Sequence, residues 1–389
     1  PTFTIHMKKR LAFSITVATL LCLSITVRSQ TKPQEPNDPE GPLGTPTVLP
    51  MNINRLLAWY NSNGNQEYPS PLFSGGGMTY PRGTALGVYA SGILWGGRLH
   101  DGAITRLHVN GQYFSSGMRQ GAILGIRTSS IQSPNDSSVR LYKIRRDFRR
   151  ADLRQDAADT YRKNITDVTN ADLSKLRAAY AKDWAEWPWQ FGAPFYDTGY
   201  LDRNGQVVGA HNGVLDWGED INRNAYLDPG EDVNRNGRLD GETPGYADAD
   251  MVLWYVCNDI VASRPFSSQP VGMELQGTIW AYNRTDALAN VIYKRFRLLY
   301  KGTASTSAAA RIDSMFIAQV SDPDLGDATD DYAGCDSVLS LGFVALAAQV
   351  FASRTEAASE MAAEKRLFRY SLFYLAGIFA VLVVDRGLA

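Results

Sequence analysis

Side chains that carry oxygen recur at alternate positions in one stretch of the chain, residues 216–243. A tight loop turns its odd-numbered side chains inward, where a hard divalent cation takes carboxylate and amide oxygens together with one backbone carbonyl. The spacing fits this pattern twice and therefore predicts two consecutive calcium loops. The predicted ligands are Asp220, Asn222, Asn224, Tyr226, Asp228 and Glu231 in the first loop, and Asp232, Asn234, Asn236, Arg238, Asp240 and Glu242 in the second.

The two loops depart from the usual twelve-residue pattern in different ways. Tyr226 and Arg238 stand at the seventh position, where the backbone carbonyl is the ligand and the side chain is free to vary. Ala225 stands at the sixth position of the first loop, where a glycine normally allows the sharp turn, and we expect a strained turn there. In the second loop Thr243 falls at the twelfth position and Glu242 at the eleventh. We therefore expect an irregular closure of the second loop.

A solvated turn rich in Asp and Asn is the alternative to a cation site. Eight acidic residues lie between Asp216 and Glu242 against three arginines, and they would repel one another without a cation. The second loop begins on the residue after the first ends, which leaves no room for the helices of paired EF-hands. The stretch resembles the tandem loops of dockerins and thrombospondin type 3 repeats, which implies that calcium orders an irregular backbone. Residues 202–205 look like a degenerate half-loop upstream.

The sequence around the loops favours a mainly β fold. Short aromatic and aliphatic runs broken by Gly and Pro are typical of antiparallel strands. Strands are predicted at 86–98, 104–110, 251–257, 274–283, 287–300 and 311–320. Their spacing predicts an antiparallel, sandwich-like body over residues 51–343. Asn170 is expected to cap a helical insert whose apolar stripe runs from Leu173 to Trp187 and which Pro188 ends.

Several phrases of the body carry a family resemblance. They are ASGILWGGRL, MVLWYVCND, NVIYKRFRLLYKGT and SDPDLGDATDDYAGCDSVLSLGF. With them, residues 56–343 resemble a group of uncharacterised surface proteins of bacteria that use type IX secretion. The resemblance implies export and a surface location, and it implies no catalytic activity.

The first residues are typical of a targeting segment. Residues 1–6 precede the first methionine, Met7, and we expect them to be a reading-frame extension. Three basic residues and an apolar run to Val27 then predict a cleaved secretory signal that ends at Ser29, with a membrane anchor as the alternative. Residues 30–50, rich in Pro and polar side chains, are expected to be a linker. The protein is therefore expected to be secreted or held at the cell surface.

Residues 344–389 differ in character from the body. An Ala-rich segment leads into an apolar run over residues 367–384, which predicts a transmembrane helix, with a buried core helix as the alternative. The sequence KRLFRYSLFYLAGIFAVLVVDR resembles the last transmembrane helix of haem O synthase, the protohaem IX farnesyltransferase of the UbiA superfamily. That family needs Asp-rich motifs, but Asn258-Asp259 lacks the second carboxylate. We therefore expect a chimeric chain joined near residues 343–345.

Charge and motifs exclude several functions. The formal charge of −1, from 39 basic and 40 acidic residues, gives no field that would favour nucleic acid. The basic run over residues 140–154, with aspartates interleaved, is expected to be a solvated face that leads from a strand into a helix. No G-x-S-x-G, H-E-x-x-H or paired C-x-x-C motif indicates catalysis. Cys257 and Cys335 are left to form one disulfide or two buried thiols.

Together these features predict an exported calcium-binding surface or adhesion module without evident catalysis. Its expected partners are calcium ions, with cell-surface glycans or proteins as further candidates, and it would meet a membrane only through the C-terminal helix. One alternative is a prenyltransferase fragment fused to an unrelated body. The other is a secreted carbohydrate-binding or carbohydrate-active protein, in which Trp184, Trp187 and Trp189 would stack on sugar rings.

Overall fold

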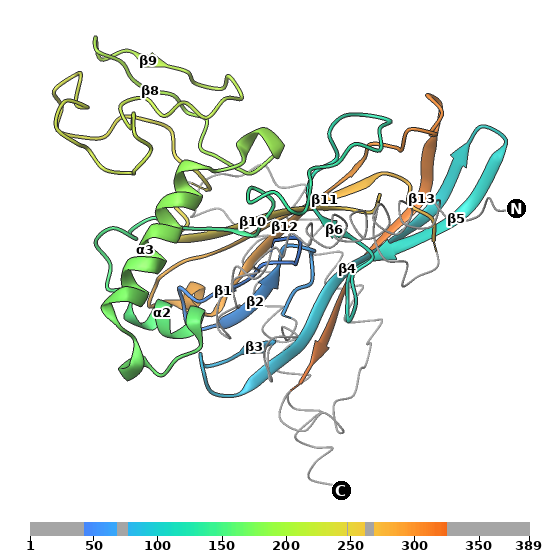
Figure 1. Cartoon of the computed structure of the whole chain (residues 1–389), viewed down its shortest axis with the longest axis horizontal. Coiled ribbons are helices and arrows are strands. Elements are labelled where there is room, and N and C mark those ends of the chain that lie inside the picture. Colours follow the sequence, from blue (N-terminus) through green and yellow to red (C-terminus); the bar gives the residue numbers. More distant parts are fainter. Residues whose placement is uncertain (1–42, 68–76, 247, 261–267, 325–389) are drawn as a thin grey trace, which may run out of the picture. The chain divides into compact units, whose positions relative to one another are not determined.

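The computed structural model describes residues 43–67, 77–246, 248–260 and 268–324 (Figure 1). By its contacts the chain divides into two units, residues 1–326 and 327–389, and every described residue belongs to the first. The signal segment, most of the predicted linker and the apolar run 367–384 lie outside the described residues. Within the described ranges no helix is long and apolar enough to cross a membrane.

The described chain is mainly antiparallel β-structure, as the sequence predicts. One sheet has the order β1-β2-β3-β4-β13 with β5 also paired to β4, the second has the order β12-β11-β10-β6 with β7 also paired to β10, and β8 pairs with β9. The strands are β1 Val48–Met51, β2 Leu57–Asn61, β3 Met78–Thr79, β4 Leu86–Asp101, β5 Ile104–Gly111, β6 Arg119–Gln120, β7 Tyr142–Arg145, β8 Tyr200–Leu201, β9 Val207–Val208, β10 Met251–Asn258, β11 Met273–Ala281, β12 Tyr293–Tyr300 and β13 Arg311–Pro323.

The core lies between the two large sheets and under the helices. Every residue of β10 is buried, and its apolar run pairs in register with β11, so that Leu253 faces Ile279. Tyr60 of β2 and Leu176 of α3 (Asn170–Ala185) belong to the same cluster of buried side chains. Because neither face of β10 meets water, its sequence is continuously apolar rather than alternating.

The helical insert consists of α2 (Arg154–Tyr161) and α3, with short 3₁₀ turns at Ile165–Asp167 and Trp189–Phe191. A further 3₁₀ turn, Ala287–Asn290, lies between β11 and β12. The predicted helix is present, but Thr169 caps it rather than Asn170. The Thr169 side chain accepts the N–H of Asp172, whose carboxylate accepts the N–H of Thr169 in return. Trp184 and Trp187 are buried in the core. Their burial argues against the alternative in which Trp184 and Trp187 stack on sugar rings, because the apolar stripe of the helix faces the protein interior.

Two further expectations fail for reasons of tertiary contact. In β13 a bulge between Asp313 and Phe316 breaks the predicted alternation and leaves Phe316 79% exposed. The basic run 140–154 contains β7 and is not simply a solvated face. Lys143 is buried against Asp156, and Arg140 pairs with Asp183.

Candidate metal centre

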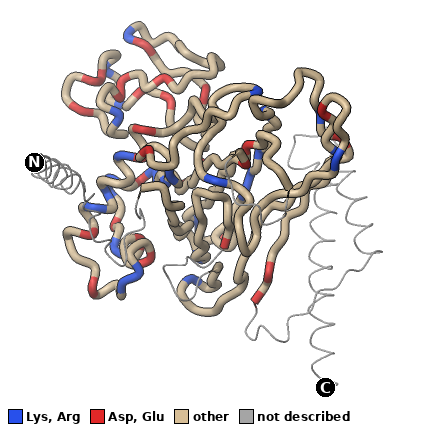
Figure 2. The backbone as a smooth tube through the Cα atoms, turned by 45° about the vertical axis from the view of Figure 1, so that its right-hand side comes forward, with Lys and Arg blue, Asp and Glu red and all other residues tan. Residues whose placement is uncertain are grey.

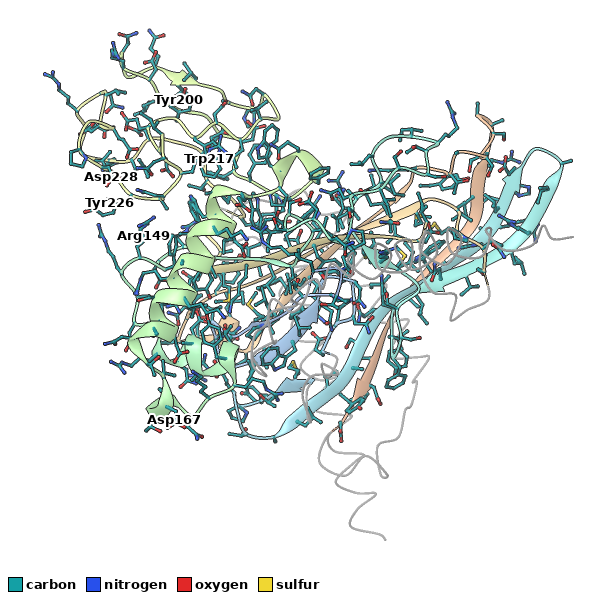
Figure 3. All side chains as sticks on the ribbon, in the orientation of Figure 1. Arg149, Asp167, Tyr200, Trp217, Tyr226 and Asp228 are labelled. Atoms are coloured by element: carbon teal, nitrogen blue, oxygen red, sulfur yellow. The ribbon has the colours of Figure 1, made fainter. Side chains whose placement is uncertain are left out.

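Residues 197–243 form an irregular segment that contains the β8–β9 hairpin and both predicted calcium loops; we call it the loop segment. Figure 2 shows acidic residues gathered along this part of the backbone. The first loop is residues 220–231 and the second is residues 232–243. The Arg149 Nε donates a hydrogen bond to the carbonyl of Asn224 and so ties the first loop to the turn after β7. Figure 3 shows Arg149 next to Tyr226 of the first loop.

Each loop winds around its first carboxylate. In the first loop Asp220 accepts the backbone N–H of Asn224 at 2.7 Å and that of Ala225 at 3.0 Å. In the second loop Asp232 accepts the corresponding N–H groups of residues 236 and 237, both at 3.0 Å. The repeat predicted from spacing is therefore a repeat of hydrogen bonds as well.

The ninth residue of each loop collects the amides of the third and fifth. Asp228 Oδ2 accepts from the Nδ2 atoms of Asn222 at 2.7 Å and Asn224 at 2.5 Å. Asp240 Oδ2 does the same, with Asn234 at 2.7 Å and Asn236 at 2.5 Å. The side chains of the third, fifth and ninth residues of each loop thus converge, although no group of three His, Cys, Asp or Glu side chains suited to a metal occurs in the described part of the chain.

The sixth and seventh residues match the sequence analysis. Ala225 adopts a left-handed φ of 57° and Gly237 one of 73°, so the turn at Ala225 is strained as expected. The side chain of Tyr226 is exposed, with the Arg150 guanidinium 6.0 Å from its ring centroid. Arg238 is exposed, and its backbone N–H donates to Asn236 Oδ1 at 2.8 Å.

The closing glutamates are arranged differently from the sequence-based assignment. Glu231 does close the first loop, because its Oε2 accepts the N–H of Asp228 at 2.9 Å. Glu242 does not contact the second loop in this way; it accepts the N–H groups of Gly199 at 2.7 Å and Asp216 at 3.1 Å. The cause is a local antiparallel pairing, in which Glu242 donates its N–H to the Asp216 carbonyl at 2.8 Å.

Glu219, which the sequence analysis passed over, takes the place expected of Glu242. Its Oε1 accepts the N–H of Val233 at 2.8 Å, and its Oε2 accepts the N–H of Asp240 at 3.1 Å. Both ends of the second loop are thus held by a carboxylate that precedes the first loop. No local spacing could reveal this contact, since it joins residues on opposite sides of the first loop.

A third stretch repeats the hydrogen bonds of the two loops. Asn212 donates its Nδ2 to Asp216 at 2.8 Å, as the fifth residue donates to the ninth in each loop. Asp197 accepts the N–H groups of Asn212 at 3.1 Å and Gly213 at 2.8 Å. The signal was present in the sequence, where NGVLDWGE (212–219) matches NAYLDPGE (224–231). The predicted half-loop at 202–205 is the turn of the β8–β9 hairpin.

Four carboxylates of the loop segment are buried, and no Lys, Arg or His among the described residues forms an ion pair with them. Glu219 is 2% exposed, Asp220 4%, Glu231 6% and Glu242 4%. Burial raises the pKa of Asp220, and the nearby charge of Glu231 adds to this, against hydrogen bonds that lower it. Most buried carboxylates elsewhere do have a cationic partner: Glu67 with Lys294, Asp156 with Lys143, Asp183 with Arg140 and Glu274 with Lys301.

Comparisons with protein-family models, curated proteins and solved structures found no match. The functional interpretation therefore rests on the geometry of this chain.

Proposed function

We propose that this chain is an exported surface or adhesion module whose loop segment binds calcium ions. The burial of Glu219, Asp220, Glu231 and Glu242 without an ion pair among the described residues carries the proposal. Removing a carboxylate from water without a counter-charge costs several kcal/mol. A divalent cation in each loop would offset that cost, and side chains that offer only oxygen suit calcium better than zinc or copper.

The ligand set of each loop fits a calcium ion. The first and ninth residues offer carboxylates, the third and fifth offer amides, and the seventh offers its carbonyl. The Asn224 Oδ1 is buried and accepts no hydrogen bond among the described residues. Rotation of an Asn side chain by 180° exchanges its Nδ2 and Oδ1, so the amides that now donate to Asp228 and Asp240 would turn their oxygens to an ion. Calcium would supply the charge that gathers these oxygens.

A structural role also fits the way in which the loops join the body. We place the first loop on a two-sheet, sandwich-like scaffold, to which it is attached through Arg149 and through Ala225, whose methyl group packs against the main core. Ordering the first loop would therefore stiffen the surface next to the helical insert. Such a device suits a protein that must keep its shape outside the cell.

Calcium-dependent unfolding of the purified chain tests the proposal. We expect saturating calcium to raise the unfolding temperature, since a ligand that binds only the folded state at a hundred times its Kd adds about 2.7 kcal/mol. The double variant Asp220→Asn/Asp232→Asn should lose most of this shift. Asp167→Asn is the matched control, because Asp167 is exposed in a 3₁₀ turn away from the loops (Figure 3). The absence both of heat on titration with millimolar calcium and of any effect of chelator on unfolding would refute the proposal.

A further inference from the structure

We infer that Glu219 holds the second loop closed and thereby couples cation binding in the two loops, so that they fill cooperatively. The inference rests on the proposed function of the same loops. It concerns a positioning residue outside the predicted ligand set, and it concerns how the sites act on each other.

Glu219 bridges the two ends of the second loop. One carboxylate oxygen binds the N–H of Val233, which follows the first ligand Asp232, and the other binds the N–H of the ninth residue, Asp240. In the first loop Glu231 likewise binds the N–H of the ninth residue, Asp228. Each loop therefore has a buried glutamate on the N–H of its ninth residue. Only in the second loop does that glutamate come from elsewhere in the chain.

Each of these two glutamates directly precedes the first ligand of a loop in the sequence. Glu219 directly precedes Asp220, the first ligand of the first loop, and Glu231 directly precedes Asp232, the first ligand of the second. An ion that fixes Asp220 also fixes the backbone of Glu219, and hence the carboxylate on the second loop. The entropy cost of ordering this shared segment then falls on the first ion alone, which makes the second bind more tightly. Linkage requires that the effect be the same in reverse.

The backbone before the first loop (residues 217–219) contacts the end of the second loop (residues 240–241) closely, so that ordering one also orders the other. The Glu219 N–H donates to the Asp240 carbonyl at 2.7 Å. A Cβ atom at Gly218 would lie 2.3 Å from the Asp240 carbonyl oxygen, and one at Gly241 would lie 2.3 Å from that of Trp217. Only glycine permits so close an approach, so the backbone before the first loop cannot move far without moving the end of the second.

Calcium titration calorimetry on the full chain tests the coupling, with Glu219→Gln compared with Asp259→Asn. Asp259→Asn is the matched control, because Asp259 is equally buried and accepts three backbone N–H groups, but lies outside the loop segment. We expect Glu219→Gln to lower the calcium affinity of the second loop about 10- to 100-fold, the usual effect of losing a residue that orients metal ligands. It should also lower the calcium affinity of the first loop and bring the Hill coefficient of calcium binding to one. Asp259→Asn should leave the cooperativity of the two loops unchanged.

Three results separate the possibilities. Loss of second-loop binding in Glu242→Gln, with Glu219→Gln unaffected, would assign the closure to Glu242 and overturn the inference. An unchanged first-loop affinity in Glu219→Gln would overturn the coupling while leaving the proposed function intact. A wild-type chain that takes up no calcium would refute the proposed function itself. Should Glu219→Gln fail to fold, Glu219→Asp keeps the charge with a shorter reach, and unchanged cooperativity in that variant would equally overturn the inference.

Discussion

The Lys143 ammonium lies 3.1 Å from the Asp156 carboxylate in the protein interior, and each side chain is only 3% exposed. Asp156 also accepts the hydroxyl of Tyr180 at 2.5 Å and pairs with Arg145 at 3.3 Å. The charge of this carboxylate is thus compensated by the protein alone. Asp220 and Glu231 in the loop segment are buried to nearly the same degree without such partners. Asp156 thus has its counter-charge within the protein, whereas Asp220 and Glu231 form no ion pair among the described residues.

Replacing Lys143 with methionine should destabilise the body strongly. The substitution leaves Asp156 with Arg145 as its remaining cationic partner among the described residues, and breaking a buried pair costs up to about 3–5 kcal/mol. Chemical denaturation at saturating calcium measures the loss. Arg284→Met is the control, because the Arg284–Asp286 pair is about half exposed and an ion pair on the surface contributes little to stability. Equal losses in the two variants would contradict the prediction.

Asp259 should make stability fall as the pH rises. It is 1% exposed and accepts the N–H groups of Val271, Gly272 and Met273. Burial raises its pKa to about 6, against the lowering effect of these hydrogen bonds. The folded state therefore keeps a proton that the unfolded chain releases near pH 4. Between about pH 4 and pH 6 the folded state loses about 3 kcal/mol of stability from this group.

The free energy of unfolding of the wild type and of Asp259→Asn, measured from pH 4 to pH 7, checks this sign. The variant cannot ionise at this position, so its stability should lack the decline and should compare more favourably with the wild type at pH 7 than at pH 4. Both series are measured at the same calcium concentration, so that any contribution of the loop segment is common to the two proteins. Parallel pH profiles for the two proteins would show that the Asp259 carboxyl ionises alike in the folded and unfolded chain.

The sequence predicts a strand well where the residues of that strand alone show its type. The run that became β10 is almost entirely apolar and is followed by turn residues, so its type is evident, whereas β11 carries Glu274, Gln276 and Thr278 among its apolar residues. The basic run was expected to begin in a strand, but the burial of β7 was not expected, because Lys143 and Arg145 interrupt its apolar pattern. Their charges are tolerated there only through Asp156 of α2, a partner that no single strand can reveal. The bulge in β13 likewise depends on its pairing with β4.

In the candidate site, too, contacts within one loop follow from the sequence, whereas contacts between distant residues do not. Contacts of Asp220 and Asp232 with residues four and five positions later follow from the loop pattern, and the sequence analysis could place them. The closure by Glu219 depends on how residues 216–219 pair with residues 240–242, which spacing within one loop does not determine. The hydrogen bonds of Glu242 to Gly199 and Asp216 were not predicted for the same reason, and its role as a calcium ligand stays a prediction.

Exchanging the residues at the sixth positions should shift the affinities of the two loops in opposite directions. Ala225 has a φ of 57° and Gly237 a φ of 73°, and a left-handed backbone costs an alanine about 1 kcal/mol more than a glycine. Ala225→Gly should therefore tighten calcium binding in the first loop, and Gly237→Ala should weaken it in the second, each by about fivefold. A Cβ atom at Gly237 meets nothing within 4 Å, so strain alone acts there.

Calorimetric titration of both variants measures the shifts, and Gly205→Ala supplies the control. Gly205 has the same φ of 73° and equally open surroundings, but it lies in the β8–β9 turn outside both loops. Its substitution should lower the stability of that turn and leave both calcium affinities unchanged. If Gly237→Ala and Gly205→Ala affect binding alike, the conformation of the sixth residue does not control the ion. A weaker first loop in Ala225→Gly would mean that packing of the Ala225 methyl group against the core outweighs its backbone strain.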